Sequence, residues 1–266
     1  MRRHFHKMHG LGNDFVIVDA RETPFDVTPS LAKAIADRRT GVGCDQLIVL
    51  EPSERADLKM RIWNSDGGEV ESCGNATRCV VQLTGAKTID TAGGLLSGEA
   101  IGGEVDVSIG EPRFGWQDIP LAYATDTNPL PMAWDSLEQP IAVNVGNPHL
   151  VFFVPDAREA DLAQLGPRIE NDPAFPERIN VNVVTYVGNR LKLRTFERGA
   201  GETLACGTGA CASAVAAILT KRAQSPVTVD MTGGSLTVFW SLGEPIRMRG
   251  AATHVFEGEF DLEALA

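Results

Sequence analysis

The chain has 266 residues, 43% of them hydrophobic, and a formal net charge of -11 at pH 7. This length suits two hydrophobic cores of about 130 residues each, near the commonest domain size. The pI is near 4.9, and Lys and Arg never cluster beyond short pairs, so the sequence offers no basic surface for nucleic acid or anionic lipid. We therefore exclude nucleic acid and membranes as main partners.

The first ten residues, MRRHFHKMHG, lack the apolar core of a signal peptide, and no run reaches the roughly 18 apolar residues of a membrane span. We therefore expect a cytoplasmic protein. Its five cysteines are an odd number, and the cytoplasm is reducing, so reduced thiols are expected rather than a disulfide framework.

Strand patterns dominate the first half of the chain. Apolar, β-branched runs predict strands at 14–20 and 46–50, and alternating apolar and polar residues predict a half-buried strand at 58–64, followed by a turn at 65–68. Glycine pairs at 93–94 and 102–103 predict tight hairpins between residues 87 and 110.

A short helix is predicted after Thr28, which suits the N-cap, with Pro29 at the first helical position. We expect Gly41 to end this helix. The side chains expected to face inward are Leu31, Ala34 and Ile35.

The second half follows a stretch at 112–140 that holds five prolines and little periodicity, where we place the domain crossover. The elements predicted beyond it are strands at 141–145 and 150–154, a helix from about 161, a hairpin at 180–197 turning at 188–189, a helix from about 208, a hairpin turning at 233–234, and a final strand ending near Phe260.

Three blocks of the two halves match at one shift of 133 residues: 58–63 with 191–196, 68–74 with 201–207, and 108–112 with 241–245. This period is too long for a solenoid and indicates a duplicated domain. We predict an N-terminal domain at 1–116, completed by the terminal segment 251–266, and a C-terminal domain at 117–250.

Cys73 and Cys206 occupy equivalent positions in this duplication, each in a glycine-rich loop that leads into a helix-forming sequence. The first N–H groups of a helix have no intrahelical partner, so a helix start can hold an anion. Each half therefore supplies one anion site with a thiol at its edge. We expect the site in a cleft between the two related domains.

Two thiols on opposite sides of one ligand suit stereochemical inversion, in which one group removes a proton from a carbon and another returns a proton to the opposite face. A thiol of pKa about 8.5 is only roughly 3% thiolate at pH 7, and a helix terminus lowers this pKa by less than about one unit. Further stabilisation must come from exclusion of water and from amide donors aimed at the substrate carboxylate. The donors expected are the backbone amides of Gly74, Asn75, Gly207 and Thr208. We expect the two thiols to titrate as a coupled pair.

The motifs MHGLGNDF, GVGCDQL, NSDGGEVESCGNATRC, GNPH, ERINV and ERGAGETLACGTGAC resemble diaminopimelate epimerases over nearly the whole chain. The resemblance implies an α+β protein of two pseudo-symmetric domains, each a mixed sheet curled around a central helix. It also implies interconversion of LL- and meso-diaminopimelate, for lysine and peptidoglycan synthesis, without pyridoxal phosphate or metal. Cys73 and Cys206 are then the acid/base pair.

The resemblance further implies a set of substrate-binding side chains: Asn13, Gln46, Asn64, Asn147, Asn180, Glu197 and Arg198. An Arg for a carboxylate and oxygen acceptors for an ammonium suit the second, unreacting amino-acid head of diaminopimelate. Spacing alone favours turn chemistry for the asparagines. His149 in GNPH is open between a site residue, a turn residue and a buried core histidine.

Two departures from the family pattern concern the first cysteine loop. Ala76 stands where glycine is usual, and the helix after Cys73 has to end by about Thr84, before Gly85, which is shorter than the family implies. Of the remaining acidic residues, Glu69 and Glu202 each lie four residues before a cysteine and have no assigned chemical role beyond accepting from loop amides.

Cys44, Cys79 and Cys211 are interpreted as core residues, and the cysteine spacings and scattered histidines do not match a zinc motif. No cofactor is expected, and the expected partner is a small-molecule amino-acid substrate. The sequence does not decide whether the chain forms a homodimer. Three alternatives stay open: a racemase of another amino acid, as in the proline racemase group, a thiol-redox protein, and a ligand-binding protein with the same fold.

Overall fold

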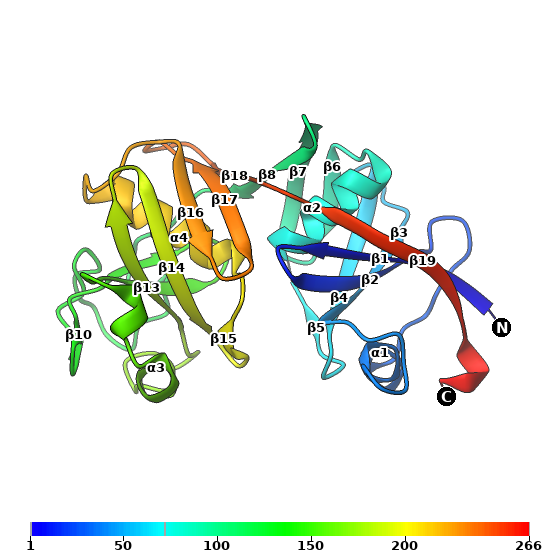
Figure 1. Cartoon of the computed structure of the whole chain (residues 1–266), viewed down its shortest axis with the longest axis horizontal. Coiled ribbons are helices and arrows are strands. Elements are labelled where there is room, and N and C mark those ends of the chain that lie inside the picture. Colours follow the sequence, from blue (N-terminus) through cyan, green and yellow to red (C-terminus); the bar gives the residue numbers. More distant parts are fainter. Residues whose placement is uncertain (1, 72, 266) are drawn as a thin grey trace. The chain divides into compact units, whose positions relative to one another are not determined.

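The computed structural model describes residues 2–71 and 73–265, and it divides into two compact units (Figure 1). Unit 1 comprises the residues up to Val107 and those from Gly250 on, and unit 2 comprises Ser108–Arg249. The crossover expected at 116/117 lies a few residues after the end of the first segment of unit 1.

Unit 1 is a mixed sheet with two helices. Its strands pair antiparallel except for β2 with β3 and β4 with β6, which are parallel. The elements are β1 (Arg2–Gly10), β2 (Asn13–Asp19), α1 (Pro29–Ala36), β3 (Gln46–Glu51), β4 (Leu58–Asn64), β5 (Glu69–Val70), α2 (Gly74–Thr84), β6 (Thr88–Thr91), β7 (Gly94–Ile101), β8 (Glu104–Gly110) and β19 (Thr253–Asp261), followed by a 3-10 turn, η2 (Leu262–Ala264).

Unit 2 repeats this order of antiparallel and parallel pairs, with β12–β13 and β14–β16 as its parallel pairs. Its elements are β9 (Ala133–Trp134), β10 (Leu137–Glu138), β11 (Ile141–Asn144), β12 (Pro148–Phe153), η1 (Ala157–Glu159), α3 (Leu162–Glu170), β13 (Asn180–Val187), β14 (Arg190–Glu197), β15 (Gly201–Thr203), α4 (Gly207–Leu219), β16 (Val227–Met231), β17 (Gly234–Phe239) and β18 (Ile246–Gly250). The shared topology confirms the predicted α+β fold built from two similar halves.

Each unit holds one helix that begins at a predicted cysteine. The α4 helix packs against β11 to β14, β16 and β17, and its residues from Gly209 to Ala217 are all buried. A helix that is apolar on all sides is stable only in a core, which explains this central position. The α2 helix packs against β1, β7 and β19 and ends at Thr84, as predicted, because Gly85 adopts the left-handed conformation at the C-cap. α1 and α3 pack on the outer sides of the two sheets.

The first helix departs from its prediction. Thr28 caps α1 by accepting from the amide of Leu31 at 3.2 Å, but the helix ends at Ala36 and buries Ala32, Ile35 and Ala36. Leu31 and Ala34, predicted to face inward, are only partly buried. The early end has a local cause, since the Asp37 carboxylate accepts from the amides of Arg39 and Thr40 and replaces the next helical turn with a side-chain-capped turn.

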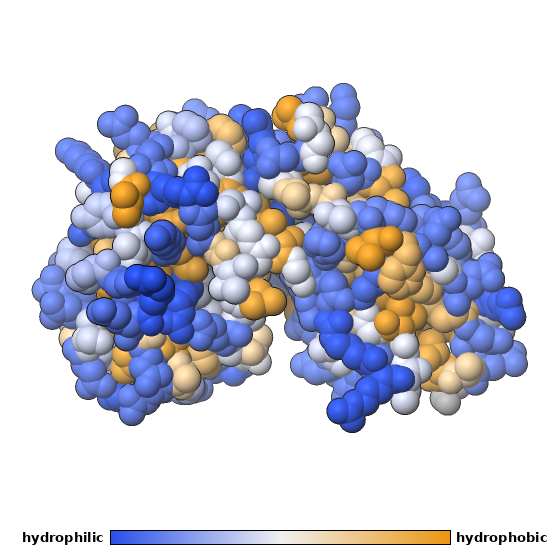
Figure 2. All heavy atoms as spheres, in the orientation of Figure 1, coloured by the Kyte–Doolittle hydropathy of each residue, from blue (hydrophilic) through white to orange (hydrophobic). Residues whose placement is uncertain are grey.

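Strands β1, β5, β9, β10, β15 and β18 were not predicted. β1 is rich in His, Arg and Lys, yet it pairs with β2 on one edge and β19 on the other. In Figure 2 the viewed surface is mostly hydrophilic, with a group of apolar side chains on the unit that carries the chain termini. Within the described residues, no helix is long and apolar enough to span a membrane.

Candidate active site

Cys73 is the N-cap residue of α2. Its backbone is extended, with φ −150° and ψ 112°, and its carbonyl accepts both the amide and the hydroxyl of Thr77 at 2.9 Å. Its side chain is partly buried, and its Sγ lies 3.8 Å from Asn13 Oδ1. The thiol is therefore accessible at the edge of a helix start whose amides, including those of Gly74 and Asn75, lack intrahelical acceptors.

Two predicted asparagines meet at this thiol. Asn75 Nδ2 donates to Asn13 Oδ1 at 3.2 Å, and Asn75 Oδ1 accepts from Arg78 Nη2 at 2.9 Å. Arg78 is fully buried and also donates to the Ala251 carbonyl at 3.3 Å. A buried guanidinium thus fixes the orientation of the Asn75 amide. This role of Arg78 was not predicted from the sequence. The signal for it is an arginine within a helix that has to be buried, where the side chain must find hydrogen-bond acceptors.

Asn13 is held from its other end by Asp45, whose Oδ2 accepts from Asn13 Nδ2 at 3.0 Å and from the amide of Asp14 at 3.1 Å. Arg38 donates to both Asp45 and Asp14. The hydrogen bonds of Asp14 with Arg38 and Lys7 outweigh its burial and hold its pKa well below the usual range. This ion cluster, which the sequence analysis missed, positions Asn13 next to the Cys73 thiol.

Gln46 and Asn64 lie opposite each other on β3 and β4, and Gln46 Nε2 donates to Asn64 Oδ1 at 2.8 Å. Among the described residues, Gln46 Oε1 is buried without a hydrogen-bond partner. A buried acceptor without a donor costs about 1–3 kcal/mol, which a donor on a ligand would offset. The two side chains are therefore arranged to accept from a polar ligand.

Cys206 is the N-cap residue of α4, equivalent to Cys73 in unit 1. It is 4% exposed, and its Sγ accepts from the amide of Gly209 at 3.3 Å and lies 3.5 Å from Thr208 Oγ1. Burial, followed by the charge of Glu197, raises the pKa of this thiol well above its ordinary value. The expected lowering of the thiol pKa by the helix start is thus outweighed at Cys206, and the thiol is protonated near neutral pH.

A buried polar layer lies beneath the start of α4. Asn182 Oδ1 accepts from Thr195 Oγ1 at 3.0 Å, and Asn182 Nδ2 donates to the Leu150 carbonyl at 2.9 Å. A Cβ at Gly209 would lie 2.6 Å from Asn182 Oδ1 and 2.9 Å from Thr195 Oγ1, so only glycine fits there. The sequence analysis missed this layer, although Asn180 and Asn182 alternate with valines in a buried strand and therefore share a face.

His149 continues the layer toward a predicted site residue. Its Nδ1 is 3.0 Å from Asn182 Nδ2 and its Nε2 is 2.8 Å from Asn147 Oδ1. An amide NH₂ can only donate, so Nδ1 is the acceptor and Nε2 carries the proton that it donates to Asn147. Complete burial, with a smaller effect of Arg198, lowers the pKa of His149 to about 3. His149 is thus a neutral buried histidine that orients the Asn147 amide.

The remaining predicted residues gather at the end of β14. Asn180 Oδ1 accepts from the amide of Arg198 at 2.9 Å, and its Nδ2 donates to the Pro148 carbonyl at 2.7 Å. The exposed Arg198 side chain donates to the Glu177 carbonyl at 3.0 Å. Glu197 accepts from the hydroxyl of Thr203 and lies close enough to Cys206 to raise its pKa.

In the part of the chain that the structure describes, Glu69 and Glu202 pair with arginines rather than with loop amides. Each forms a two-point ion pair with an Arg on the preceding strand, Arg61–Glu69 at 2.8 and 2.9 Å and Arg194–Glu202 at 2.8 and 3.1 Å. These pairs are related by the same shift of 133 and tie β5 to β4 and β15 to β14. They hold the strand that leads into each cysteine loop.

The other three cysteines are buried, as predicted, with exposures of 2% for Cys44 and 0% for Cys79 and Cys211. Burial raises the pKa of Cys44 to about 11 and that of Cys79 to about 12. The thiols of Cys44 and Cys79 therefore stay protonated, and all three cysteines act as small apolar side chains.

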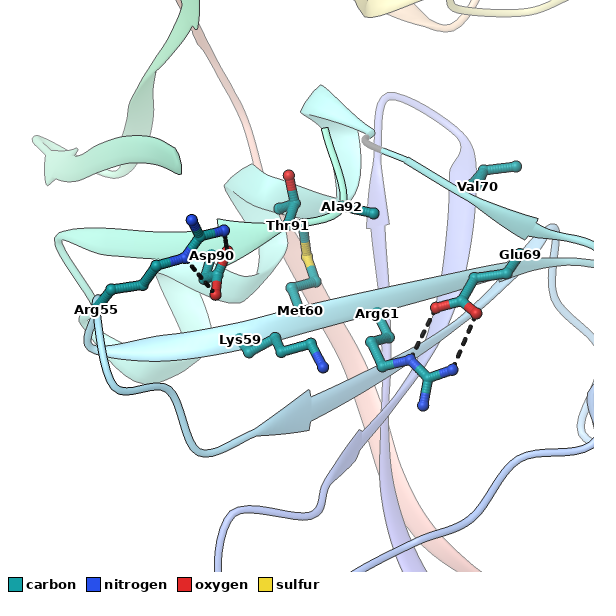
Figure 3. Close-up of a pocket in the computed structure, with 9 residues that line it drawn as sticks. All are labelled: Arg55, Lys59, Met60, Arg61, Glu69, Val70, Asp90, Thr91 and Ala92. Carbon is teal, nitrogen blue, oxygen red and sulfur yellow. Dashed lines mark hydrogen bonds and ion pairs between the residues drawn. The ribbon is translucent and has the colours of Figure 1, made fainter. Parts of the chain in front are cut away.

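A separate cavity of about 380 Å³ opens on unit 1 beside β4, β5 and β6 (Figure 3). Its cationic side chains are paired with acids, Arg55 with Asp90 and Arg61 with Glu69. None of the predicted site residues lines it; its lining is Arg55, Lys59, Met60, Arg61, Glu69, Val70, Asp90, Thr91 and Ala92. The cavity therefore takes no part in the candidate site.

Comparison with known proteins identifies related sequences over nearly the whole chain. The family model for diaminopimelate epimerase matches residues 5–114 and 141–255. Diaminopimelate epimerase of Rhizorhabdus wittichii is 60% identical over 99% of this chain and 97% of its own length. That of Sphingopyxis alaskensis is 61% identical over 98% of each chain.

Solved structures with the same fold are more distant in sequence. A probable proline racemase from Agrobacterium radiobacter aligns with a TM-score of 0.68 at 14% identity, covering 98% of this chain and 93% of its own. A PhzF-family phenazine biosynthesis protein from Bacillus anthracis gives 0.65 at 17% identity over 98% and 99% of the two chains. These likenesses support the duplicated α+β architecture.

Proposed function

The chain belongs to the diaminopimelate epimerase family, and we infer that it is an isomerase that interconverts LL- and meso-diaminopimelate. The observation that carries this inference is the sequence identity of 60% or more to two epimerases over at least 97% of their lengths. The cysteine-capped helices, one in each half, supply side chains suited to that chemistry. The activity would serve lysine and peptidoglycan precursor synthesis in the cytoplasm, where thiols stay reduced.

We propose that Cys73 and Cys206 perform the inversion by two-base proton transfer. One thiolate removes the α-proton, the electron pair of the broken C–H bond moves into the substrate carboxylate, and the other thiol delivers its proton to the opposite face. The first cysteine then ends as a thiol and the second as a thiolate, so the reverse reaction starts from the exchanged protonation states. No cofactor has to hold the electrons if the carboxylate is well stabilised.

Stabilisation of that carboxylate is assigned to the first-turn amides of α2 and α4. The donors are those of Gly74, Asn75, Gly207 and Thr208, at helix starts that favour negative charge. The raised pKa of Cys206 supports its role as the protonated member of the pair, because a buried thiol flanked by Glu197 gives up its proton only to a strong base such as a carbanion.

The non-reacting head of the substrate is assigned to the polar side chains around the two cysteines. Arg198 suits its carboxylate, and the oxygens of Asn64, Gln46 and Glu197 suit its ammonium. The unpartnered Gln46 Oε1 supports this assignment. Asn13, Asn147 and Asn180 complete the proposed set.

Purified enzyme tests the proposal in an assay that converts LL- into meso-diaminopimelate. Cys73→Ala and Cys206→Ala should each lower kcat/KM by at least about a thousandfold, because proton removal and return both need a positioned group. Cys79→Ala, in the buried part of α2, is the matched control and should retain activity. Activity within tenfold of wild type in either test variant would reject that cysteine's role.

The other activities considered for this fold make different predictions in the same assay. A racemase of another amino acid would turn over proline or a similar substrate faster than diaminopimelate. A thiol-redox protein would gain its function on oxidation, whereas oxidation of the proposed pair should only inactivate, with recovery after reduction. A ligand-binding protein would bind diaminopimelate without turnover.

A further inference from the structure

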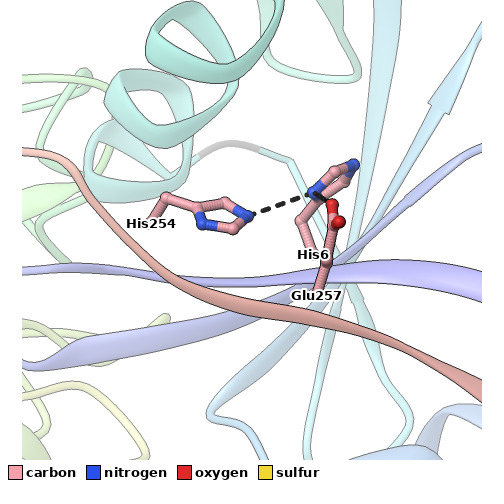
Figure 4. Close-up of side chains that lie close together, drawn as sticks. All are labelled: His6, His254 and Glu257. Atoms are coloured by element: carbon pink, nitrogen blue, oxygen red, sulfur yellow. Dashed lines mark hydrogen bonds and ion pairs between the residues drawn. The ribbon is translucent and has the colours of Figure 1, made fainter.

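A cluster of imidazole and carboxylate groups lies on the β1–β19 strand pair, away from the cysteine loops in sequence. His6 Nδ1 is 3.2 Å from His254 Nε2 and 3.6 Å from Glu257 Oε2, and the three ligand atoms all lie within 4.8 Å of one another (Figure 4). Neither the proposed chemistry nor substrate recognition uses these residues.

A β-bulge brings the three side chains to one face. The register of β19 against β1 shifts between Lys7 and Met8, so that His254 pairs with Met8 and Phe256 with Lys7. Residues three apart on a regular strand point to opposite faces, but the extra residue in the bulge puts His254 and Glu257 on the same face as His6. On the opposite face, Phe256 contacts the ring of Phe5.

Two of the three spacings between the ligand atoms fit a tetrahedral cation, and the third is no more than 4.8 Å. Metal–ligand distances of about 2.0–2.1 Å for imidazole nitrogen place neighbouring tetrahedral ligands about 3.3–3.4 Å apart. The two distances from His6 Nδ1, 3.2 and 3.6 Å, bracket that value. His254 and Glu257 are exposed, so a cation has access from solvent.

A further imidazole, that of His4, lies beside the three ligand groups. The ring of His4 lies edge-on to that of His6 at a centroid distance of 4.9 Å, and His4 Nε2 lies 3.6 Å from Glu257 Oε2, where it can hold the carboxylate in place.

We propose that His6, His254 and Glu257 bind a divalent transition-metal cation, with Zn²⁺ as the best-suited ion and water in the fourth position. Two imidazoles and one carboxylate form a ligand set that zinc commonly takes. The cation would join β19, which closes unit 1 from the end of the chain, to β1. Its role is then to secure the terminal strand, independently of epimerisation.

Cobalt and zinc titrations of the full chain test the proposal. Co²⁺ reports its ligands, because thiolate ligation adds a sulfur-to-cobalt charge-transfer band that imidazole and carboxylate ligation lack. We expect Co²⁺ to bind in a one-to-one ratio with visible d–d bands and no sulfur band, and Zn²⁺ to displace it. Zn²⁺ should also raise the Tm, since it binds only the folded site.

Variants with matched controls locate the site. His254→Asn and Glu257→Gln should each weaken Co²⁺ binding by at least about tenfold and abolish the Zn²⁺-dependent rise in Tm. Glu259→Gln is the control for Glu257→Gln, because Glu259 lies on the same exposed strand but faces Arg2 at 3.7 Å. No one-to-one binding, a sulfur-to-cobalt band as the main signal, or equal affinity in the Glu257 and Glu259 variants would overturn the proposal.

Discussion

The starts of α2 and α4 share a backbone plan and differ in what lies beneath them. Cys73 and Cys206 are related by a shift of 133 residues. The same shift relates Val16, Val49 and Ile62 to the buried polar residues His149, Asn182 and Thr195. All three of the unit 1 residues are fully buried, so an apolar layer in unit 1 corresponds to a hydrogen-bonded layer in unit 2.

The same comparison accounts for the unusual alanine in the first cysteine loop. Ala76 corresponds to Gly209, and it is fully buried in the unit whose equivalent layer is apolar. In unit 2 a methyl group at position 209 would collide with Asn182 and Thr195. Glycine is thus required above the polar layer of unit 2, whereas the apolar layer of unit 1 accommodates alanine. The two halves therefore share the same cysteine N-cap, although the layer beneath the helix is apolar in unit 1 and polar in unit 2.

The largest effect is expected when Gly209 of unit 2 is replaced by alanine, the residue at the equivalent position of unit 1. Gly209→Ala should displace the start of α4, lowering kcat/KM at least about 100-fold and stability by about 1–3 kcal/mol. The matched change, Ala76→Gly, should cost only about 1 kcal/mol and leave kcat/KM within a few-fold. Epimerase kinetics and urea unfolding measure both. Equal effects in the two halves would break the comparison.

A smaller effect is expected for the free energy that couples members of the polar layer. Asn182→Val removes the side-chain partner of the Thr195 hydroxyl and of His149 Nδ1, and an unsatisfied buried group costs about 1–3 kcal/mol. In a double-mutant cycle, the variant that carries both Asn182→Val and Thr195→Val should therefore lose less stability than the two single variants lose together. The difference should exceed about 0.5 kcal/mol. Additive losses would show that the layer does not act as one network.

A pH effect should separate the halves, because His149 has a valine, Val16, as its counterpart. The pKa of His149 is lowered to about 3 by burial, so the unfolded chain binds the extra proton below about pH 6.5. Its contribution to stability is complete above that pH and declines as the pH falls from 6.5 toward 3. Wild type should lose about 1.6 kcal/mol more than His149→Gln between pH 6.5 and 5.0. Parallel stability curves would contradict this.

The smallest effect is expected from the ion pairs that the halves have in common. Glu69→Gln and Glu202→Gln should each cost less than about 1 kcal/mol, since both pairs are partly exposed. Arg61→Ala and Arg194→Ala should each cost more than the glutamate variant of the same pair. Arg61 also pairs with Glu51 and lies over the Trp63 ring, and Arg194 Nη1 also donates to the carbonyls of Ala157 and Ala160 at 2.9 and 2.8 Å. Chemical unfolding of the four variants ranks them. A glutamate variant that costs more than the arginine variant of its pair would contradict the assigned contacts.

Sequence patterns were informative where a local rule decides the structure. The hairpin at 180–197, its turn at 188–189, the cap at Thr28 and the helix end at Gly85 follow from periodicity, turn residues and capping, which act over a few residues. The duplication was visible because its register survives in the elements around both cysteines.

The features that the sequence did not reveal depend on long-range pairing. β1 carries mostly polar side chains and is a strand because β2 and β19 supply its backbone partners. The roles of Arg78 and Asp45 depend on a cation and a carboxylate meeting asparagines from other elements. The polar layer depends on three strands beneath one helix, which no local pattern encodes.

The most direct test of the two-thiol mechanism is epimerisation of LL-diaminopimelate in deuterated water, stopped at low conversion. A proton removed by one cysteine and a second delivered by a solvent-exchanged cysteine on the opposite face should leave deuterium at the inverted α-carbon of essentially all new meso product, with little in recovered LL substrate. NMR or mass spectrometry of the separated isomers measures both. Inverted product that keeps its original α-hydrogen would contradict proton transfer by two thiols.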